Sequence, residues 1–250
     1  MLNEERKLLI LKEVNDKGSI TVQELRNKFD TSESTIRRAI TDLSREGKLV
    51  KVFGGAVALD SAYDIHESSG HVKEIINKDE KLKIGEYAAS LIEPGDYVFI
   101  DSGSTTAYML KFIRERNALY VTNAVSHAKE LAKNRFKVLL VGGEMKENTE
   151  SIVGADAILH IQKYHFTKGF FGTNGVNLKL GFTTPDVREA LVKRVAIENT
   201  NAGGRFILAD HDKFGKTCAV TFSDFGGTLV ITDKRPDTSY INVMDVKVVY

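Results

Sequence analysis

The sequence has 250 residues, of which 42% are hydrophobic and 20 are glycine, a composition typical of a chain with a buried core rather than of a disordered one. Charge is nearly balanced, with 35 lysines and arginines against 34 aspartates and glutamates, so a nucleic-acid partner would have to be bound by a local patch. The single cysteine, Cys218, excludes an internal disulfide, and no apolar stretch reaches the roughly 18 residues of a membrane span. We therefore expect a cytoplasmic protein of one or two domains without a membrane partner.

The first 57 residues predict three short helices followed by a hairpin. Apolar residues at helical spacing predict helices over about 3–16, 22–29 and 33–46. Thr21 and Glu24 have the spacing of a capping box before the second helix, and Ser32 is an N-cap candidate for the third. The segment 49–53 precedes Gly54-Gly55, a pattern that predicts one arm of a hairpin and a tight turn.

After residue 58 the periodicity is lost, and we interpret residues 59–76 as a linker between a domain over 1–58 and a domain over 77–250. In the second domain short apolar runs alternate with helical patterns, which predicts an α/β fold on a mainly parallel sheet. The expected strands are 97–100, 119–122, 138–141, 169–171, 206–209, 229–232 and 246–249. The expected helices are 78–92, with a cap at Asn77, and 105–116, 125–134, 155–163 and 187–200.

The third predicted helix has the features of a DNA recognition helix. In a helix-turn-helix, the second helix of the pair enters the major groove, and its first turns contact base edges through small polar and arginine side chains. The candidate DNA-binding residues are Ser32, Ser34, Thr35, Arg37, Arg38, Lys51, Gly54 and Gly55. An arginine pair on a short helix is often only a solvated face, but the order of three helices and a hairpin favours DNA binding.

A second candidate functional segment follows the strand predicted at 97–100. The segment 101–106 places small residues and hydroxyls between a strand and a helix, where backbone N–H groups and the helix dipole attract an anion. It lacks the ending of a nucleotide-binding P-loop, and an ordinary capped turn is the alternative. Because ligands of open α/β sheets bind beyond the carboxyl ends of the strands, we expect loops after other strands to join it. The candidate ligand-binding residues are Asp101, Ser102, Gly103, Ser104, Thr105, Thr106, Thr122, Asn123, Gly142, Gly143, Asn174, Gly175, Glu189 and Lys213.

Three motifs in residues 3–58 occur together: Ser32-x-x-Thr35-Ile36-Arg37-Arg38, Gly47-x-Leu49 and Gly54-Gly55-Ala56. With these motifs, the segment resembles the DeoR-type winged helix-turn-helix, which implies binding to double-stranded operator DNA. Two positions depart from the family pattern: Ala39-Ile40 stands where Asp-Leu is usual, and Phe53 stands where histidine is usual. The missing aspartate removes an orienting partner for an arginine, which implies a different operator preference.

Residues 77–250 resemble the DeoR C-terminal sensor domain, which is grouped with ribose-5-phosphate isomerase-like and CoA-transferase-like folds. Within it, the segments 171–176, 181–186 and 189–191 are similar to the fructose-operon repressors of Gram-positive bacteria. This resemblance implies a repressor of a sugar-utilisation operon that is relieved by a phosphorylated sugar, with fructose 1-phosphate as the first candidate. A lactose-type repressor that senses tagatose 6-phosphate is the alternative.

An isomerase-type enzyme is the alternative from a different class. Such enzymes need a carboxylate base beside the substrate, and Asp101, Asp186, Glu189 and Asp210 are available. Asn174 stands in a loop where related enzymes tend to carry acidic residues, and an isomerase does not need the DNA-binding segment. We therefore expect no catalysis.

The remaining expectations concern metals and assembly. The six histidines lack metal-site spacing, so we expect neither a metal nor a cofactor. His127 could line the ligand pocket, but a histidine at such a position is more often an ordinary residue on the surface of a helix, which is what we expect. A single winged helix reads too few base pairs for useful specificity, so a homodimer or homotetramer is expected.

Overall fold

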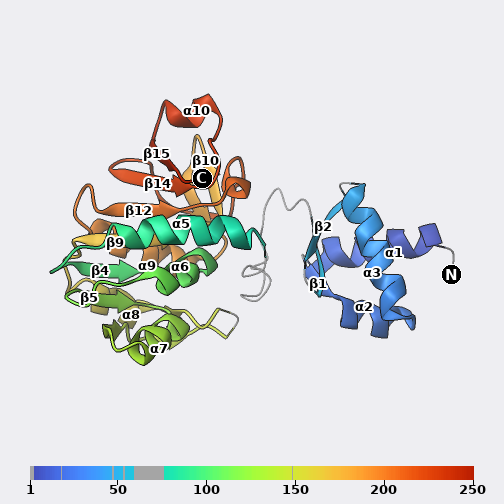
Figure 1. The fold of residues 1–250 in the computed structure, drawn as a ribbon, viewed down its shortest axis with the longest axis horizontal. Coiled ribbons are helices and arrows are strands. Elements are labelled where there is room, and N and C mark those ends of the chain that lie inside the picture. The colour runs from blue at the N-terminus through green and yellow to red at the C-terminus, as the bar shows by residue number, and fades with distance from the viewer. Residues whose placement is uncertain (1–2, 18, 47, 53, 59–75, 148) are drawn as a thin grey trace. The chain divides into compact units, whose positions relative to one another are not determined.

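The computed structural model describes all residues except 1–2, 18, 47, 53, 59–75 and 148 (Figure 1). The chain divides into two compact units, Met1–Ile76 and Asn77–Tyr250, each of which has its own core. Most of the segment that we interpret as a linker lies outside the described residues.

The first unit contains the three predicted helices and a small antiparallel sheet of strand order β1-β3-β2. Its elements are α1 (Asn3–Lys17), β1 (Ser19–Thr21), α2 (Val22–Phe29), α3 (Glu33–Arg45), β2 (Leu49–Val52) and β3 (Gly55–Ala58). Helix α2 begins with the predicted capping box, in which Thr21 Oγ1 accepts from Glu24 N at 3.1 Å and Glu24 Oε2 accepts from Thr21 N at 2.8 Å. Ser32 caps α3 by accepting from Thr35 N at 3.3 Å. Strand β1 was not predicted, because its partner strand lies more than 30 residues further along the chain.

The second unit is built on a seven-stranded parallel sheet of order β15-β14-β12-β9-β4-β5-β6, which confirms the expected parallel α/β architecture. The sheet strands are β4 (Tyr97–Ile100), β5 (Leu119–Thr122), β6 (Lys137–Leu140), β9 (Lys168–Gly172), β12 (Arg205–Leu208), β14 (Thr228–Thr232) and β15 (Asp245–Val248). The helices are α5 (Lys78–Ser90), α6 (Ser104–Met109) with the 3-10 turn η1 (Leu110–Phe112), α7 (Val125–Lys133), α8 (Ala155–Ile161), α9 (Val187–Glu198), the 3-10 turn η2 (His211–Lys213) and α10 (Thr238–Ile241).

Two small antiparallel sheets were not predicted. Strands β7 (Glu144–Met145) and β8 (Ile152–Val153) form one of them, and β10 (Gly175–Asn177), β11 (Gly181–Thr184) and β13 (Val220–Ser223) form the other. Each of these strands is two to four residues long and therefore leaves almost no periodic pattern in the sequence.

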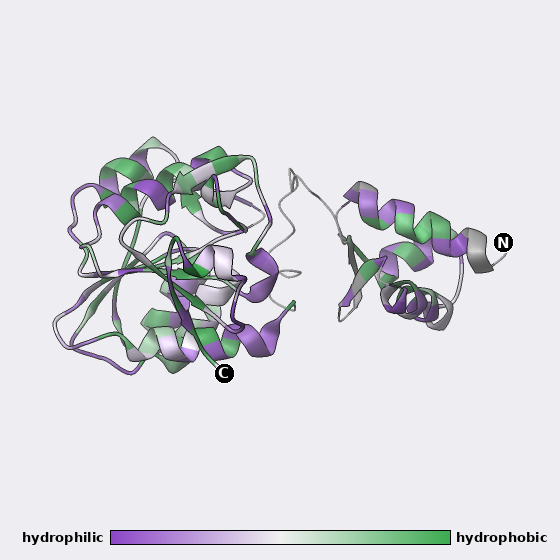
Figure 2. Ribbon diagram, turned by 90° about the horizontal axis from the view of Figure 1, so that it is seen from above, coloured by the Kyte–Doolittle hydropathy of each residue, from purple (hydrophilic) through white to green (hydrophobic). Residues whose placement is uncertain are grey.

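Helices cover both faces of the large sheet, because successive side chains of each strand point to opposite sides. Val98 and Ile100 of β4 pack with α5 and α6 in one core cluster, whereas Phe99, between them, packs with α8 and α9 in the other. In Figure 1, α5 crosses in front of the sheet. The helices carry alternating hydrophobic and hydrophilic stretches (Figure 2), as expected for helices with one buried face. None of the described helices is both long and apolar enough to cross a membrane.

Candidate functional site

Five loops with predicted ligand-binding residues lie at one edge of the large sheet. They follow β12, β9, β4, β5 and β6, which are neighbours in that order and run parallel, so their carboxyl ends meet at the same edge. The first residues beyond these ends include Asp101 after β4, Asn123 after β5 and Asn174 after β9. The strand order thus brings together segments that are far apart in the sequence.

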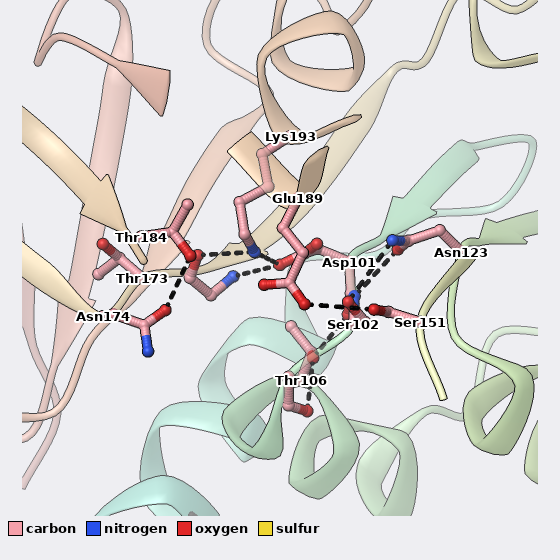
Figure 3. A network of polar contacts seen from close by, with 12 residues as sticks. Asp101, Ser102, Thr106, Asn123, Ser151, Thr173, Asn174, Thr184, Glu189 and Lys193 are labelled. Carbon is pink, nitrogen blue, oxygen red and sulfur yellow. Dashed lines mark hydrogen bonds and ion pairs between the residues drawn. The ribbon is translucent and has the colours of Figure 1, made fainter. Parts of the chain in front are cut away.

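A buried ion pair lies at the centre of this edge (Figure 3). Asp101 is 1% exposed, and its Oδ2 accepts from Lys193 Nζ and, at 3.0 Å, from the backbone N–H of Gly172. Lys193 is 3% exposed and also donates to the carbonyl oxygen of Gly172 at 3.2 Å. Lys193, which is not among the residues predicted from the sequence, therefore joins α9 to the segments that follow β4 and end β9.

A second charged cluster lies one helical turn earlier on α9. Glu189, 7% exposed, accepts from Lys146 Nζ at 2.8 Å and from the hydroxyls of Thr149 and Ser151 at 3.3 Å each. Lys146 also pairs with Asp186 at 2.9 Å. Glu189 thus holds the segment that carries β7 and β8 against α9. Lys146 is a second buried lysine that is not among the residues predicted from the sequence.

Hydrogen bonds within the chain shape the segment 101–106. Asn123 Oδ1 accepts from Ser102 N at 3.0 Å, and Thr106 Oγ1 donates to the carbonyl oxygens of Asp101 at 2.7 Å and Gly103 at 2.9 Å. Thr122, the last residue of the neighbouring strand β5, accepts through Oγ1 from Ala124 N at 3.1 Å. Asn123, Thr106 and Thr122 therefore hold the backbone in place, whereas Gly103 is exposed and Ser102 and Ser104 are half-buried.

His127 is buried beside this segment, so the expectation that it lies on the surface is wrong. Its side chain is 3% exposed, and its ring forms a hydrogen bond with the backbone of Gly103. Burial lowers the pKa of His127 to about 4, which keeps the ring neutral near pH 7. Within the described residues Nδ1 has no hydrogen-bond partner.

The other predicted ligand-binding residues line the neighbouring loops. Asn174 Oδ1 accepts from Thr184 Oγ1 at 3.1 Å, and the N–H of Gly142 donates to His160 Nδ1 at 2.9 Å. A Cβ atom on Gly175 would stand 2.5 Å from the carbonyl oxygen of Lys216, and one on Gly143 would stand 2.8 Å from that of Val153. The two glycines therefore serve close packing. Thr105 is buried, and Lys213 lies 3.5 Å from Asp210 Oδ2 within its own loop.

In the first unit, α3 presents most of the predicted DNA-binding residues to the solvent. Ser32 Oγ lies 2.9 Å from Ser34 Oγ and 2.7 Å from Thr35 Oγ1, and Arg38 is exposed. Arg37 is exposed as well and donates to Glu33 Oε1 from Nε at 2.9 Å.

The hairpin residues have different surroundings. Lys51, exposed on β2, donates to Thr41 Oγ1 of α3 at 2.9 Å. Gly54 adopts a φ of +84°, which favours glycine. Gly55 is buried, and a Cβ atom there would stand 2.4 Å from the carbonyl oxygen of Ile20. Gly55 thus serves the pairing of β1 with β3.

Among the residues that the structure describes, no group of three or more histidine, cysteine, aspartate or glutamate side chains is arranged to hold a metal ion. Cys218, the single cysteine of the sequence, is buried.

Comparisons with known proteins match both units. The family model of the DeoR-like helix-turn-helix domain matches residues 6–62, and that of the DeoR C terminal sensor domain matches residues 76–234. The chain is 38% identical over 251 residues to the uncharacterized HTH-type transcriptional regulator FruR of Bacillus subtilis (strain 168), covering 100% of this chain and 98% of that protein. It is 33% identical over 246 residues to the lactose phosphotransferase system repressor of Staphylococcus aureus, covering 94% and 96%.

Similar solved structures include ribose 5-phosphate isomerase A from Methanocaldococcus jannaschii, with 15% identity, a TM-score of 0.41 and coverage of 55% of each chain. They also include the full-length sorbitol operon regulator SorC from Klebsiella pneumoniae, with 10% identity, a TM-score of 0.43 and coverage of 90% of this chain and 94% of that one. The two family models match successive parts of the chain, and the 38% identity to FruR extends over the whole chain, which confirms the resemblance seen in the sequence. The chain belongs to the DeoR family of transcriptional regulators, with an N-terminal winged helix-turn-helix domain and a C-terminal α/β sensor domain.

Proposed function

We propose that this protein is a sequence-specific repressor of a sugar-utilisation operon and that a phosphorylated sugar, fructose 1-phosphate first among the candidates, relieves repression. The observation that carries the proposal is that five loops meet at one edge of the large sheet, where two buried ion pairs hold them in place. The same chain has a helix, α3, whose exposed face is polar. The similarity to proteins named as a sugar phosphotransferase repressor and as FruR supports it. Such a repressor acts on operator DNA in the cytoplasm.

In this proposal α3 lies in the major groove. Arg37 and Arg38 supply forked donors that match the acceptors of guanine or a phosphate, and the hydroxyls of Ser32, Ser34 and Thr35 surround the start of the helix. The ion pair with Glu33 holds Arg37 on the exposed face of α3 before DNA arrives. Lys51 and the turn at Gly54 contact the DNA backbone.

Operator binding by two variants tests the DNA interface. Replacing Arg37 with alanine should cost about 1–3 kcal/mol of operator binding and relax the preference at one base position. Replacing Lys51 with alanine should weaken binding to all sequences alike and flatten the salt dependence by about one unit of slope. Fluorescence anisotropy with operator and scrambled duplexes at several salt concentrations measures both effects. Unchanged affinity in both variants would rule out α3 and the hairpin as the interface.

The effector would bind at the sheet edge, with its phosphate on the N–H groups of the segment Gly103–Thr106. The hydrogen bonds of Asn123 to Ser102 and of Thr106 to Gly103 hold the backbone in place at the start of this segment, and Gly103 is exposed. Small residues there allow an anion to approach the backbone closely. Lys213 adds positive charge from the loop after β12, and Asn174 offers its amide to sugar hydroxyls.

Calorimetric titration tests the effector site. Fructose 1-phosphate should bind and raise the melting temperature through preferential binding to the folded state, whereas free fructose should do neither. The backbone of Gly103 is extended, with φ of 172°, so it tolerates valine. The side chain of Gly103→Val should block the approach of the phosphate and abolish binding of fructose 1-phosphate. Lys213→Ala should weaken this binding. Lys216→Ala, on an exposed lysine of the same loop, is the matched control. Equal binding of fructose and fructose 1-phosphate would refute the phosphate site, and tighter binding of tagatose 6-phosphate would identify a lactose-type sensor.

We expect no catalysis, because two of the carboxylates that could act as the base are engaged in buried ion pairs. Asp101 pairs with Lys193, and Glu189 pairs with Lys146, so neither is a free base at this edge. Incubation with fructose 1-phosphate and ribose 5-phosphate, followed by NMR spectroscopy, should therefore show unchanged substrates. Turnover that is lost in Glu189→Gln would replace the repressor proposal with an enzymatic one.

A further inference from the structure

Asn77 joins the start of α5 to one of the loops at the sheet edge. It is the first residue of the second unit and adopts a left-handed backbone conformation, with φ of 52° and ψ of 43°. It stands at the predicted N-cap position of α5, but its side chain forms no cap hydrogen bond. Instead, Nδ2 donates to Asp210 Oδ1 at 3.1 Å and to Asp212 Oδ2 at 2.8 Å.

Asp210 is the buried centre of these contacts. It is 0% exposed at the end of β12, accepts from the N–H of Asp212 at 3.1 Å, and has Lys213 Nζ 3.5 Å from its Oδ2. Burial opposes its ionisation, but Lys213, Lys81 and the hydrogen bond from Asn77 hold the pKa of this carboxyl below its usual value. Lys81, 2% exposed, lies one turn after Asn77 on α5.

The partners of Asp210 are energetically linked. A buried carboxylate is stable only while its charge is paired and hydrogen-bonded. A ligand phosphate that draws Lys213 toward itself removes part of that pairing, so Asp210 must rely more on Asn77 and Lys81. Any ligand that engages Lys213 therefore changes the free energy of the contacts that Asn77 makes.

The side-chain contacts of Asn77 also affect the backbone conformation of this residue. A left-handed conformation costs an L-residue about 1–2 kcal/mol, although asparagine visits it more readily than most. The two side-chain bonds offset this cost and hold the backbone at the point where the chain leads toward the first unit. A change in these bonds therefore changes the preferred direction of the chain at residue 77.

We propose that Asn77 is a positioning residue that couples ligand binding at the loop of Asp210 and Lys213 to the chain direction at the start of the sensor unit, and thereby to DNA affinity. The inference rests on the proposed function. Asn77 acts through Asp210 and Asp212 and touches neither the ligand nor DNA. What it sets is the size of the response, that is, the ratio of DNA affinities with and without the sugar phosphate.

The test uses the full chain and compares wild type with Asn77→Gly, which keeps access to the left-handed backbone but removes both side-chain bonds. Arg135→Gly is the matched control, because Arg135 also has a positive φ, of 62°, but is exposed after α7. Operator affinity is measured by anisotropy with and without fructose 1-phosphate. Calorimetry measures the affinity for fructose 1-phosphate with and without DNA. By thermodynamic reciprocity, the factor by which DNA changes the affinity for the sugar phosphate must equal the factor by which the sugar phosphate changes the affinity for DNA.

Wild type and Arg135→Gly should show equal responses, on the order of tenfold to a hundredfold. Asn77→Gly should respond by less than about twofold although fructose 1-phosphate still binds, and Asp212→Ala, which removes one of the two acceptors, should give an intermediate response. A full response in Asn77→Gly would overturn the inference and leave the proposed function intact. Loss of ligand binding in Asn77→Gly would also overturn it, because Asn77 would then belong to the binding site. If fructose 1-phosphate leaves wild-type DNA affinity unchanged, the effector proposal fails and this inference falls with it.

Discussion

Lys146 and Lys193 carry positive charge into the interior of the sensor unit, each against a carboxylate that stabilises it. Glu189 and Lys193 lie four residues apart on α9, so one face of this helix presents a negative and a positive charge to different loops. The buried face of α9 is thereby tied to the segment after β4 and to the segment that carries β7 and β8 (Figure 3).

Removing one partner of the Asp101–Lys193 pair should destabilise the sensor unit strongly. Lys193→Met leaves the charge of Asp101 buried and short of partners, which should cost about 3–5 kcal/mol. The double variant Asp101→Asn/Lys193→Met removes both charges and should cost less than the single Lys193→Met. Chemical denaturation measures each value, with the exposed Lys163→Met as control, expected within about 0.5 kcal/mol of wild type. A double variant that is less stable than Lys193→Met would contradict the pairing.

The neutral ring of His127 predicts a specific dependence of stability on pH. Its pKa falls from 6.5 to about 4 in the folded chain, so the unfolded chain binds more protons between these two pH values. The free energy of unfolding should therefore fall as the pH drops from 6.5 to 4, by roughly 3 kcal/mol from this residue. His127→Gln lacks this ionisation, so wild type should lose stability relative to the variant in that window. Parallel pH profiles of the two proteins would contradict the assignment.

At the scale of elements, the small sheet of the DNA-binding unit depends on two adjacent glycines for different reasons. Gly55 lacks space for a side chain because β1 passes close by, whereas Gly54 has space but a left-handed backbone. Overpacking against a rigid backbone typically costs about 1–3 kcal/mol, and alanine at a positive φ costs about 1 kcal/mol.

Gly55→Ala should therefore weaken the pairing of β1 with β3 more than Gly54→Ala does. Amide hydrogen exchange measured on peptides that cover 19–21 and 55–58 should be faster in Gly55→Ala, because the strands must separate. In Gly54→Ala, exchange should rise less. If exchange is faster in Gly54→Ala than in Gly55→Ala, the close approach of Ile20 to Gly55 is not what makes the pairing of β1 with β3 sensitive to a side chain at residue 55.

At the scale of the whole molecule, we predict self-association. One winged helix contacts few base pairs, and two-fold symmetric operators match proteins whose copies are related by a two-fold axis. The protein should therefore sediment as a dimer or tetramer at micromolar concentration and protect two half-sites on DNA. A monomer in sedimentation, with and without operator DNA, would contradict this prediction.

Local patterns identified most of the regular elements. The apolar runs predicted as strands coincide with the seven strands of the large sheet to within one residue at every end, because most of these runs are bounded by polar or glycine residues. The caps at Thr21 and Ser32 were also predictable, because capping depends on residues within one turn. Asn77 stands at the predicted N-cap position of α5, but its side chain forms no cap hydrogen bond and instead donates to the carboxylates of Asp210 and Asp212.

For the candidate site, too, local sequence patterns predicted one part and the tertiary structure decided the other. The sequence by itself determined which loops follow the parallel strands, and hence that Asp101, Asn123 and Asn174 come to one edge. Only the tertiary structure decided what each polar group does there: Thr106 and Asn123 bond to the backbone, Lys193 pairs with Asp101, and His127 is buried. The physical reason is that residue type sets which hydrogen bonds and charges a side chain can offer. The partner that receives them is set by packing between segments tens of residues apart, which no local pattern records.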